Sequence, residues 1–159
     1  MSDDARFEDG GDEPLRLMAM DQEDLQVLSS LVQDAVFPIT EMAWKPGQRR
    51  FAMLLNRFRW EDADAAQSRG RPAERVQSTL VVGDVMKVSS QGLDRGEKDM
   101  VLSVLSVSFE PAEDGTGRVV LTLAGDGAIA LEVEALDVTL RDVTRPYIAP
   151  SKSTPHHPE

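Results

Sequence analysis

An alternation of apolar and polar residues over positions 101–143 constrains the fold of this chain more than any other feature. Serines separate the apolar residues of VLSVLSVSF, and Glu132 and Glu134 alternate with apolar neighbours in AIALEVEAL. This period of two is typical of strands with one face on a core. The run also contains a loop composition at 113–117 and an Asp-Gly pair at 126–127, which favours a tight hairpin turn. The region therefore predicts an antiparallel meander of three strands.

A helical period follows Asp21 and predicts the only substantial helix of the chain, after a short alternating strand at 15–19. Asp21 is a natural N-cap, and the acidic residues after it face the positive end of the helix dipole. Pro38 disfavours helical geometry at the residue before it, so we expect the helix to end there. The buried face is expected to consist of Leu25, Leu28, Val32 and Ala35.

Residues 39–61 have the pattern of a β-hairpin, with a Lys-Pro-Gly-Gln turn at 45–48. The second strand of this hairpin is apolar on both faces, which is typical of a central strand or of one covered by a helix. The residues that follow, 62–74, have no periodicity, and we expect them to form a loop.

The alternation of apolar and polar residues shifts by one position at two places in the predicted strands. The shift at Gly83-Asp84 suggests a bulge or a sharp bend, and the one near Ala135 suggests one extra residue. An extra residue inserted as a β-bulge bends a strand and keeps both apolar sets on the core side. A parallel α/β fold is excluded because one long helix cannot supply its crossovers. The predicted fold class is α+β, with a strongly curved antiparallel sheet or partly closed barrel of about six to seven strands and one N-terminal helix packed on it.

Composition divides the chain into one domain and two tails. Residues 1–13 are acidic with little to bury, so we expect them to be disordered. Residues 14–143 are expected to form a single α+β domain, since 159 residues are an ordinary length for one domain. Residues 144–159 contain four prolines and both histidines and are expected to form a flexible tail.

The acidic composition restricts the function classes. The chain has 28 acidic and 17 basic residues and a formal net charge of −11, which disfavours non-specific adhesion to nucleic acid or to an anionic membrane. It has no cysteine, which excludes thiolate catalysis and cysteine metal sites and fits a reducing compartment. The first residues lack the pattern of a secretory signal, and no segment is apolar for long enough to form a transmembrane helix. We therefore expect a cytoplasmic protein without a membrane partner.

Few residues suit catalysis. His156 and His157 are the only histidines and lie among prolines near the end, where a metal or base site would need ordered neighbours. Asp84, Asp94 and Asp99 lie in or beside loops with glycine and could in principle share a divalent ion or act as acid and base. The favoured interpretation is that each hydrogen-bonds its own turn. The sequence thus predicts no catalytic residue, no metal site and no cofactor.

Basic residues concentrate between positions 44 and 75. This segment has eight basic and four acidic residues, a balance of +4, so the rest of the chain sums to −15. Arginine beside aromatic residues suits phosphate contact and base stacking. The alternative is structural use, with the arginines paired to acids of the same chain or of a neighbour. The candidate binding residues are Arg49, Arg50, Arg57, Arg59 and Trp60.

Three stretches occur in the order LVQDAVFPITEMAW, RRFAMLLNRFRWE and GDGAIALEVEALDVTLRDV. Together they resemble an uncharacterised family of small cytoplasmic alphaproteobacterial proteins that is known only as a domain of unknown function. The likeness covers residues 15–143. The resemblance implies a bacterial cytoplasmic origin, and it supplies no catalytic residues because the family has none established.

Three hypotheses on function remain open. The leading one is a non-enzymatic protein-interaction or accessory domain with a protein partner or self-association, because aromatic and arginine side chains are enriched at interfaces. The second is an anion or nucleic-acid binder that uses the same arginines, with binding that weakens steeply with salt. The third, a carboxylate-based enzyme, requires that at least two acids converge in one cleft.

Overall fold

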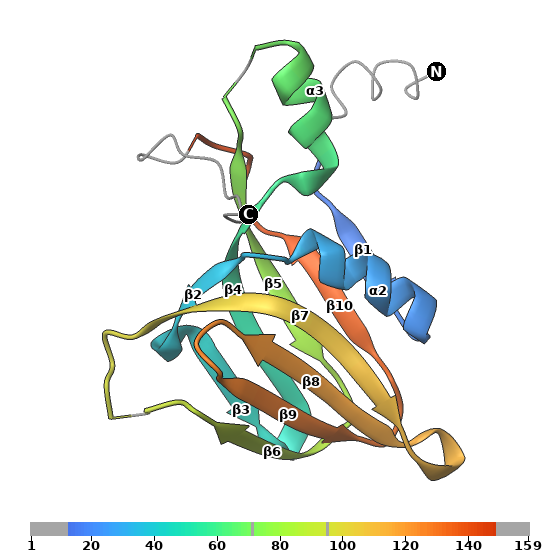
Figure 1. Ribbon diagram of the computed structural model, residues 1–159. Coiled ribbons are helices and arrows are strands. Elements are labelled where there is room, and N and C mark those ends of the chain that lie inside the picture. Colours follow the sequence, from blue (N-terminus) through green and yellow to red (C-terminus); the bar gives the residue numbers. More distant parts are fainter. Residues whose placement is uncertain (1–12, 71, 95, 149–159) are drawn as a thin grey trace.

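The computed structural model describes residues 13–70, 72–94 and 96–148, and in these residues ten strands form one antiparallel sheet (Figure 1). The order across the sheet is β1-β10-β5-β4-β2-β7-β8-β9-β6, and β3 pairs with β4 beside this path. The strands are β1 (Arg16–Ala19), β2 (Val36–Pro38), β3 (Met42–Lys45), β4 (Arg50–Phe58), β5 (Arg75–Val82), β6 (Val85–Gln91), β7 (Val101–Pro111), β8 (Gly117–Leu123), β9 (Ala128–Val133) and β10 (Val138–Asp142).

Helical segments are short in the described residues. The α-helices there are α2 (Gln22–Leu31) and α3 (Ala63–Ser68). Single 3-10 turns are η2 (Ile39–Glu41), η3 (Pro46–Gln48), η4 (Trp60–Asp62) and η5 (Glu113–Gly115). No helix in the part of the chain that the structure describes is long and apolar enough to cross a membrane.

The predicted α+β class with an antiparallel sheet is confirmed, but the predicted strand count and closure are wrong. The sheet has ten strands rather than six or seven, and it is open because its end strands β1 and β6 do not pair with each other. The three-residue strand β2 was not predicted, and two runs that were each predicted as one strand are two strands, β5 with β6 and β9 with β10. The longer helix, α2, follows β1 and is therefore not N-terminal to the sheet.

Strand β2 joins two halves of the sheet. Its Val36 pairs with Asn56 of β4 on one side and with Ser103 of β7 on the other. One half contains β1, β10, β5, β4 and β3, and the other contains β7, β8, β9 and β6. Figure 1 shows the second half crossing in front of the first. Buried side chains of both halves and of α2 form one hydrophobic cluster, so the sheet folds over a single core.

Helix α2 packs against β7 and β1 and begins where the sequence predicts. The side chain of Asp21 accepts a hydrogen bond of 2.8 Å from a backbone N–H of the first turn. The helix ends at Leu31, so the prediction that Pro38 ends it is wrong. Asp34 has a left-handed φ of 64°, and its N–H donates to Val104 O at 2.8 Å, which turns the chain into β2. The buried face predicted for the helix is confirmed at Leu25 and Leu28, whereas Val32 and Ala35 are buried but follow the helix.

Both slips of the apolar phase are passages from one strand to another. At Gly83-Asp84 the chain leaves β5, in the first half, and enters β6, in the second. At residues 134–137 it returns from β9 to β10, so the predicted bulge within one long strand near Ala135 is wrong. The passages lie side by side because Gly83 N donates to Asp137 O at 2.9 Å and Glu134 N donates to Asp84 O at 3.0 Å. The sheet therefore changes direction at one shared corner.

Two segments predicted to lack structure contribute to the fold. The expected loop at 62–74 contains α3. At the other end, Tyr147 and Arg75 exchange backbone hydrogen bonds of 2.7 and 2.9 Å, and Gln77 N donates to Thr144 Oγ1 at 3.0 Å. Residues 144–148 thus pack on β5 rather than starting a tail. The expected disorder of residues 1–12 and the rest of the expected tail, 149–159, lie outside the described residues.

Candidate functional site

Two of the predicted binding arginines lie inside the protein. Odd-numbered residues of β4 face the core, so Arg57 points inward in the same phase as Leu55. The exposed fraction is 0% for Arg57 and 4% for Arg59. A solvated patch of cations therefore does not form at these two positions.

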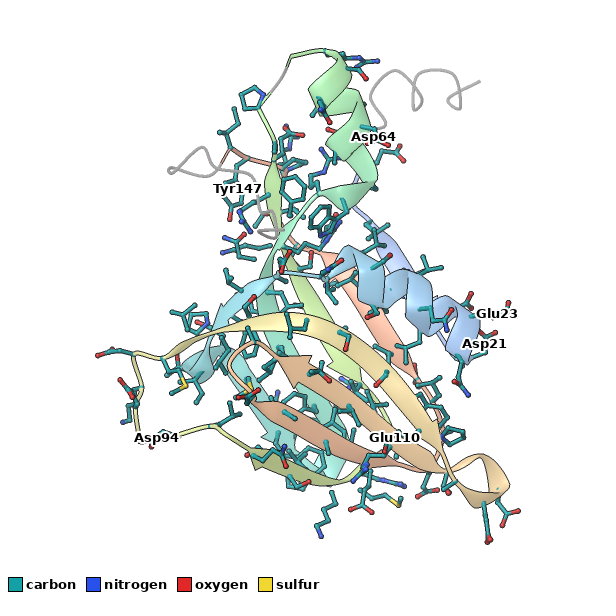
Figure 2. All side chains as sticks on the ribbon, in the orientation of Figure 1. Asp21, Glu23, Asp64, Asp94, Glu110 and Tyr147 are labelled. Carbon is teal, nitrogen blue, oxygen red and sulfur yellow. The ribbon has the colours of Figure 1, made fainter. Side chains whose placement is uncertain are left out.

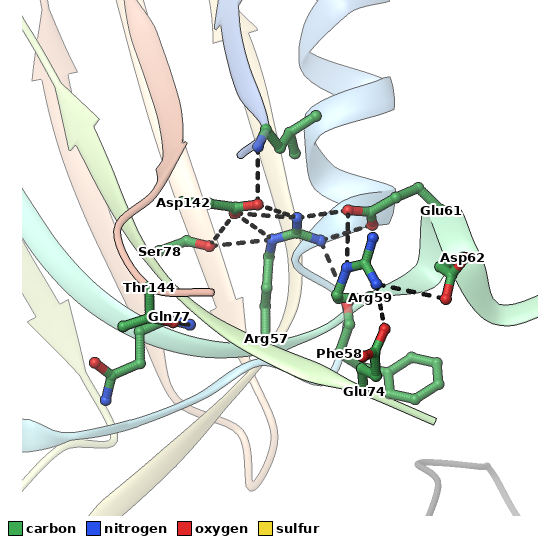
Figure 3. A network of polar contacts seen from close by, with 11 residues as sticks. Arg57, Phe58, Arg59, Glu61, Asp62, Glu74, Gln77, Ser78, Asp142 and Thr144 are labelled. Atoms are coloured by element: carbon green, nitrogen blue, oxygen red, sulfur yellow. Dashed lines mark hydrogen bonds and ion pairs between the residues drawn. The ribbon is translucent and has the colours of Figure 1, made fainter. Parts of the chain in front are cut away.

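The guanidinium of Arg57 is the centre of a buried polar network (Figure 3). It donates to both carboxylate oxygens of Glu61, at 2.8 and 2.7 Å, and to those of Asp142, at 3.1 and 3.2 Å. Its Nε also donates to Ser78 Oγ at 3.1 Å, and that hydroxyl donates to Asp142 at 2.7 Å. Asp142 in addition accepts the backbone N–H of Leu15 at 2.9 Å. The network ties β4, β5, β10 and the entry to β1 together.

Arg59 is neutralised within the chain in the same way. Its guanidinium forms an ion pair with Glu74 and a second one with Asp62 at 3.4 Å. Its backbone N–H donates to Glu74 O at 3.0 Å. Arg57 and Arg59 thus match the structural alternative, in which the arginines pair with acids of the same chain.

Trp60 is held in place rather than displayed for stacking. Its indole Nε1–H donates to Gln33 O, after α2, at 2.9 Å. Its ring packs edge-on against Phe58, with ring centroids 4.6 Å apart. These contacts dock the η4 turn on the end of α2.

Arg49 and Arg50 lie at the surface but differ in their partners. Arg49 has a left-handed φ of 54° at the end of the hairpin turn, and its side chain forms an exposed ion pair with Glu134. Arg50 opens β4 on the face away from the core, opposite Lys45 of β3. The five candidate residues therefore do not share one surface.

Ser78 and Asp142 are partners of Arg57 that were not predicted from the sequence. Each occupies a core-facing position of its strand. The residue two positions away on the same face is apolar, Leu80 in β5 and Leu140 in β10. The register places Asp142 opposite Ser78. The signal in the sequence is that each of three strands has one polar residue at a position where the alternation places apolar ones. These residues can be recognised as a network only when the order of the strands is known.

Arg57 and Glu61 each hold the other in its charged form. Burial opposes charge on Glu61, but the hydrogen bond and positive charge of Arg57 outweigh it and lower the pKa of that carboxyl below its usual value. Burial likewise opposes charge on Arg57, yet the carboxylates of Glu61 and Asp142 raise its pKa. The pair is therefore ionised throughout the physiological range.

Glu61→Gln is expected to reduce the acid sensitivity of the fold. Because the pKa of Glu61 is lowered by folding, its contribution to stability is complete above the unfolded-state pKa and is lost as the pH falls through the folded-state pKa. The variant should lose on the order of 1 kcal/mol at pH 7, discounted for the partial exposure of Glu61. Urea unfolding at pH 7 and below about pH 4 checks this. An identical pH dependence in both proteins would contradict it.

A hollow of about 360 Å³ lies between β3 and β6. Both strands are unpaired on the facing side, since β3 pairs only with β4 and β6 only with β9 among the described strands. The start of β6 is joined to the residue before β4 by one hydrogen bond of 2.8 Å, from Val85 N to Arg49 O. We call this hollow the seam, and its lining consists of Ile39, Thr40, Met42, Trp44, Phe51, Val88 and Lys98.

The acidic residues do not gather into a metal-binding group. Among the described residues no set of three or more His, Cys, Asp or Glu side chains could hold a metal ion. Asp94 accepts the N–H of Gly96 at 3.0 Å, and Asp84 and Asp126 occupy left-handed turn positions. Figure 2 shows Asp64 on α3 and Asp94 on the loop after β6, at opposite ends of the molecule. His156 and His157 lie outside the described residues.

Residues 15–157 match a family model described as Protein of unknown function (DUF2948). The chain belongs to this family. The match begins at residue 15, as the resemblance predicted, and it extends past residue 143, where the resemblance was predicted to end. No curated protein and no solved structure matches the chain. The function of this DUF2948 protein therefore has to be argued from its geometry.

Proposed function

We propose that this DUF2948 protein is a non-enzymatic interaction domain that binds an extended segment of a partner protein in the seam. The observation that carries the proposal is the pair of unpaired strand edges, β3 and β6, on either side of an apolar hollow. An exposed strand edge presents free N–H and C=O groups to which a peptide strand can add, and side-chain pockets beside it provide specificity. A bacterial cytoplasmic setting is part of the proposal, and the cysteine-free composition supports a reducing compartment.

The seam has the composition of an interaction site. Trp44 and Met42 of β3 are half-buried, and they line the hollow together with Val88 of β6 and the buried Phe51 of β4. Tryptophan and methionine are enriched at interface cores, and tryptophan often dominates the binding energy. The hairpin predicted to be the interface thus contributes through its first strand rather than through Arg57, Arg59 and Trp60.

Charge complementarity specifies the partner further. Lys98 is the one charged residue among the described residues that line the seam. Cations at the rim of an interface favour partners with the opposite charge and steer their approach. The expected ligand is therefore an extended peptide in which apolar residues alternate with acidic ones.

Selection from a displayed library of random linear peptides tests the proposal. Peptides enriched on the wild-type protein are expected to alternate apolar and acidic residues, and their Kd, measured by fluorescence anisotropy, should rise about 30-fold for Trp44→Ala. Val88→Lys should weaken binding as well, because it places a charge in the apolar hollow.

The matched control is Leu105→Lys. Leu105 is an exposed apolar residue of β7, so the same kind of substitution is made outside the seam, and binding should be unchanged. Circular dichroism melting shows whether each variant is folded. Equal binding by the wild type, Trp44→Ala and Val88→Lys would overturn the proposal, as would a library that yields no enriched peptide.

A further inference from the structure

A second hollow lies on the outer face of the sheet half that contains β1, β10, β5 and β4. Its volume is about 320 Å³. Arg16 lies directly opposite Arg141, and Arg141 directly opposite Thr79, across three neighbouring strands. Each of these residues lies next to core-facing residues in its strand and so points away from the core. We call this the arginine hollow, and its lining consists of Arg16, Arg50, Thr79, Val81, Gly83, Asp137, Thr139 and Arg141.

Within the part of the chain that the structure describes, the cations of the arginine hollow have no partner of opposite charge. Arg16, Arg50 and Arg141 are exposed, and their side chains form no ion pair or hydrogen bond with any residue that the structure describes. This differs from Arg49 and Arg118, which also lie at the surface but pair with carboxylates. Like charges directly opposite each other in a sheet are destabilising. The pairing of Arg16 with Arg141 therefore leaves a positive charge that no described carboxylate pairs with and that an anion would neutralise.

The two ends of the arginine hollow differ in chemistry. Arg16, Arg141 and Thr79 form one end, in a single cross-strand row. Asp137 lies four residues before Arg141, about 13 Å away along an extended strand. Arg50 belongs to that second end, because its neighbour Phe51 pairs with Val82, and the N–H of the next residue, Gly83, donates to Asp137 O. One end thus offers two guanidinium groups and a hydroxyl, and the other offers one carboxylate and one guanidinium.

We propose that the arginine hollow binds the phosphate group of a small phosphomonoester. Two guanidinium groups and a threonine hydroxyl match the oxygens of a phosphate, to which arginine donates in pairs. The net charge of the lining, three arginines and one aspartate, is +2 and suits a dianion. Asp137 accepts a hydrogen bond from a hydroxyl or amino group on the organic part of the ligand.

A nucleic-acid polymer fits the arginine hollow less well than a compact ligand. The lining has no aromatic side chain, so it provides no surface for stacking bases. The chain carries a net charge of −11, and a polyanion that extends beyond the hollow would meet this acidic remainder. A small dianion stays within the local field, since charges beyond about 8 Å are largely screened at physiological salt.

Nuclear magnetic resonance titration of the full chain tests the site, with inorganic phosphate and glycerol 3-phosphate as probes at constant ionic strength. Saturable shifts are expected in the backbone amides of β1, β5 and β10 around Arg16, Thr79 and Arg141, with tighter binding of glycerol 3-phosphate. Arg141→Gln should raise the Kd about tenfold, the cost of one charge-assisted hydrogen bond. The control Arg69→Gln, at an exposed position after α3, removes the same charge elsewhere and should leave the Kd unchanged.

Thermal melting adds a readout that does not depend on a ligand. In phosphate-free buffer Arg141→Gln should melt no lower than the wild type, because it relieves the repulsion with Arg16, and it should lose the phosphate-induced rise in Tm. The proposal would be overturned by shifts that do not saturate or by equal affinities of Arg141→Gln and Arg69→Gln for the phosphate probes. Tighter binding of a single-stranded oligonucleotide would also overturn it. The residues involved are not those of the seam, so either proposal can fail without the other.

Discussion

Asp142→Ala is expected to lower the free energy of unfolding by about 3 kcal/mol, because it leaves the buried guanidinium of Arg57 with part of its charge uncompensated. The side chain of Asp142 is only 3% exposed and accepts hydrogen bonds from Arg57, Ser78 and the backbone N–H of Leu15. The value lies at the lower end of the range for a broken buried pair, since Glu61 still binds Arg57. Urea unfolding at pH 7 measures it.

A second arginine–carboxylate pair provides the control for this prediction. Glu110 and Arg118 form an ion pair across β7 and β8, but their side chains are 57% and 52% exposed. Glu110→Ala should therefore cost less than about 1 kcal/mol. Similar losses in both variants would contradict the idea that burial of the Arg57 network determines its contribution to stability.

Leu121→Ala is expected to cost about 3 kcal/mol, from lost burial and from the cavity that is left. Leu121 is fully buried on β8, and its neighbours in register are Val107 of β7 and Ile129 of β9. Because these residues belong to the same core cluster as β4, β5 and α2, the loss should appear in one cooperative transition of the whole domain.

The control for the core prediction is Leu105→Ala in β7. Leu105 is 40% exposed, so the same substitution removes fewer buried contacts and should cost less than about 1 kcal/mol. Thermal melting should place Leu121→Ala about 6–12 °C below the wild type, given the sensitivity of domains of this size. Two separate melting transitions in Leu121→Ala would contradict a single core shared by the two halves of the sheet.

Features that depend on neighbours in sequence could be predicted. The cap at Asp21 needs only a side chain and the next turn of helix, and the turn between β8 and β9 needs residues that tolerate positive φ, found here at Gly125 and Asp126. The alternation in β7, β8 and β9 likewise reflects one buried face. Such local signals identified the meander, the hairpin and the start of the helix.

Features that depend on strand order could not be predicted. A phase slip in a run of apolar residues has the same pattern whether the strand bulges or the chain passes to another strand, and at 134–137 the second case applies. The open edges of β3 and β6 likewise have no local signature, because pairing is decided by segments distant in sequence. The seam depends on these edges and therefore could not be predicted from the sequence.

The candidate arginines show the same limit at the level of single residues. Arg57 is two residues after Leu55, so the alternation in β4 places both on the core face. An arginine is nevertheless expected at the surface because its side chain is charged. Its neutralisation by Asp142 depends on the position of β10, 85 residues away in sequence. Arg50 was identified, whereas its neighbours in the arginine hollow, Arg16 and Arg141, come from strands at the two ends of the domain sequence.

Backbone hydrogen exchange of the full chain, with and without a library-selected peptide, tests the interaction proposal most directly. In the free protein the outward N–H groups of β3 and β6 should exchange faster than those of the central strands β5 and β8, because no strand covers them. Addition of the peptide should slow exchange on β3 and β6 together and leave the other strands unchanged. Protection confined to another part of the sheet, or an unchanged β3 and β6 at saturating peptide, would contradict binding in the seam.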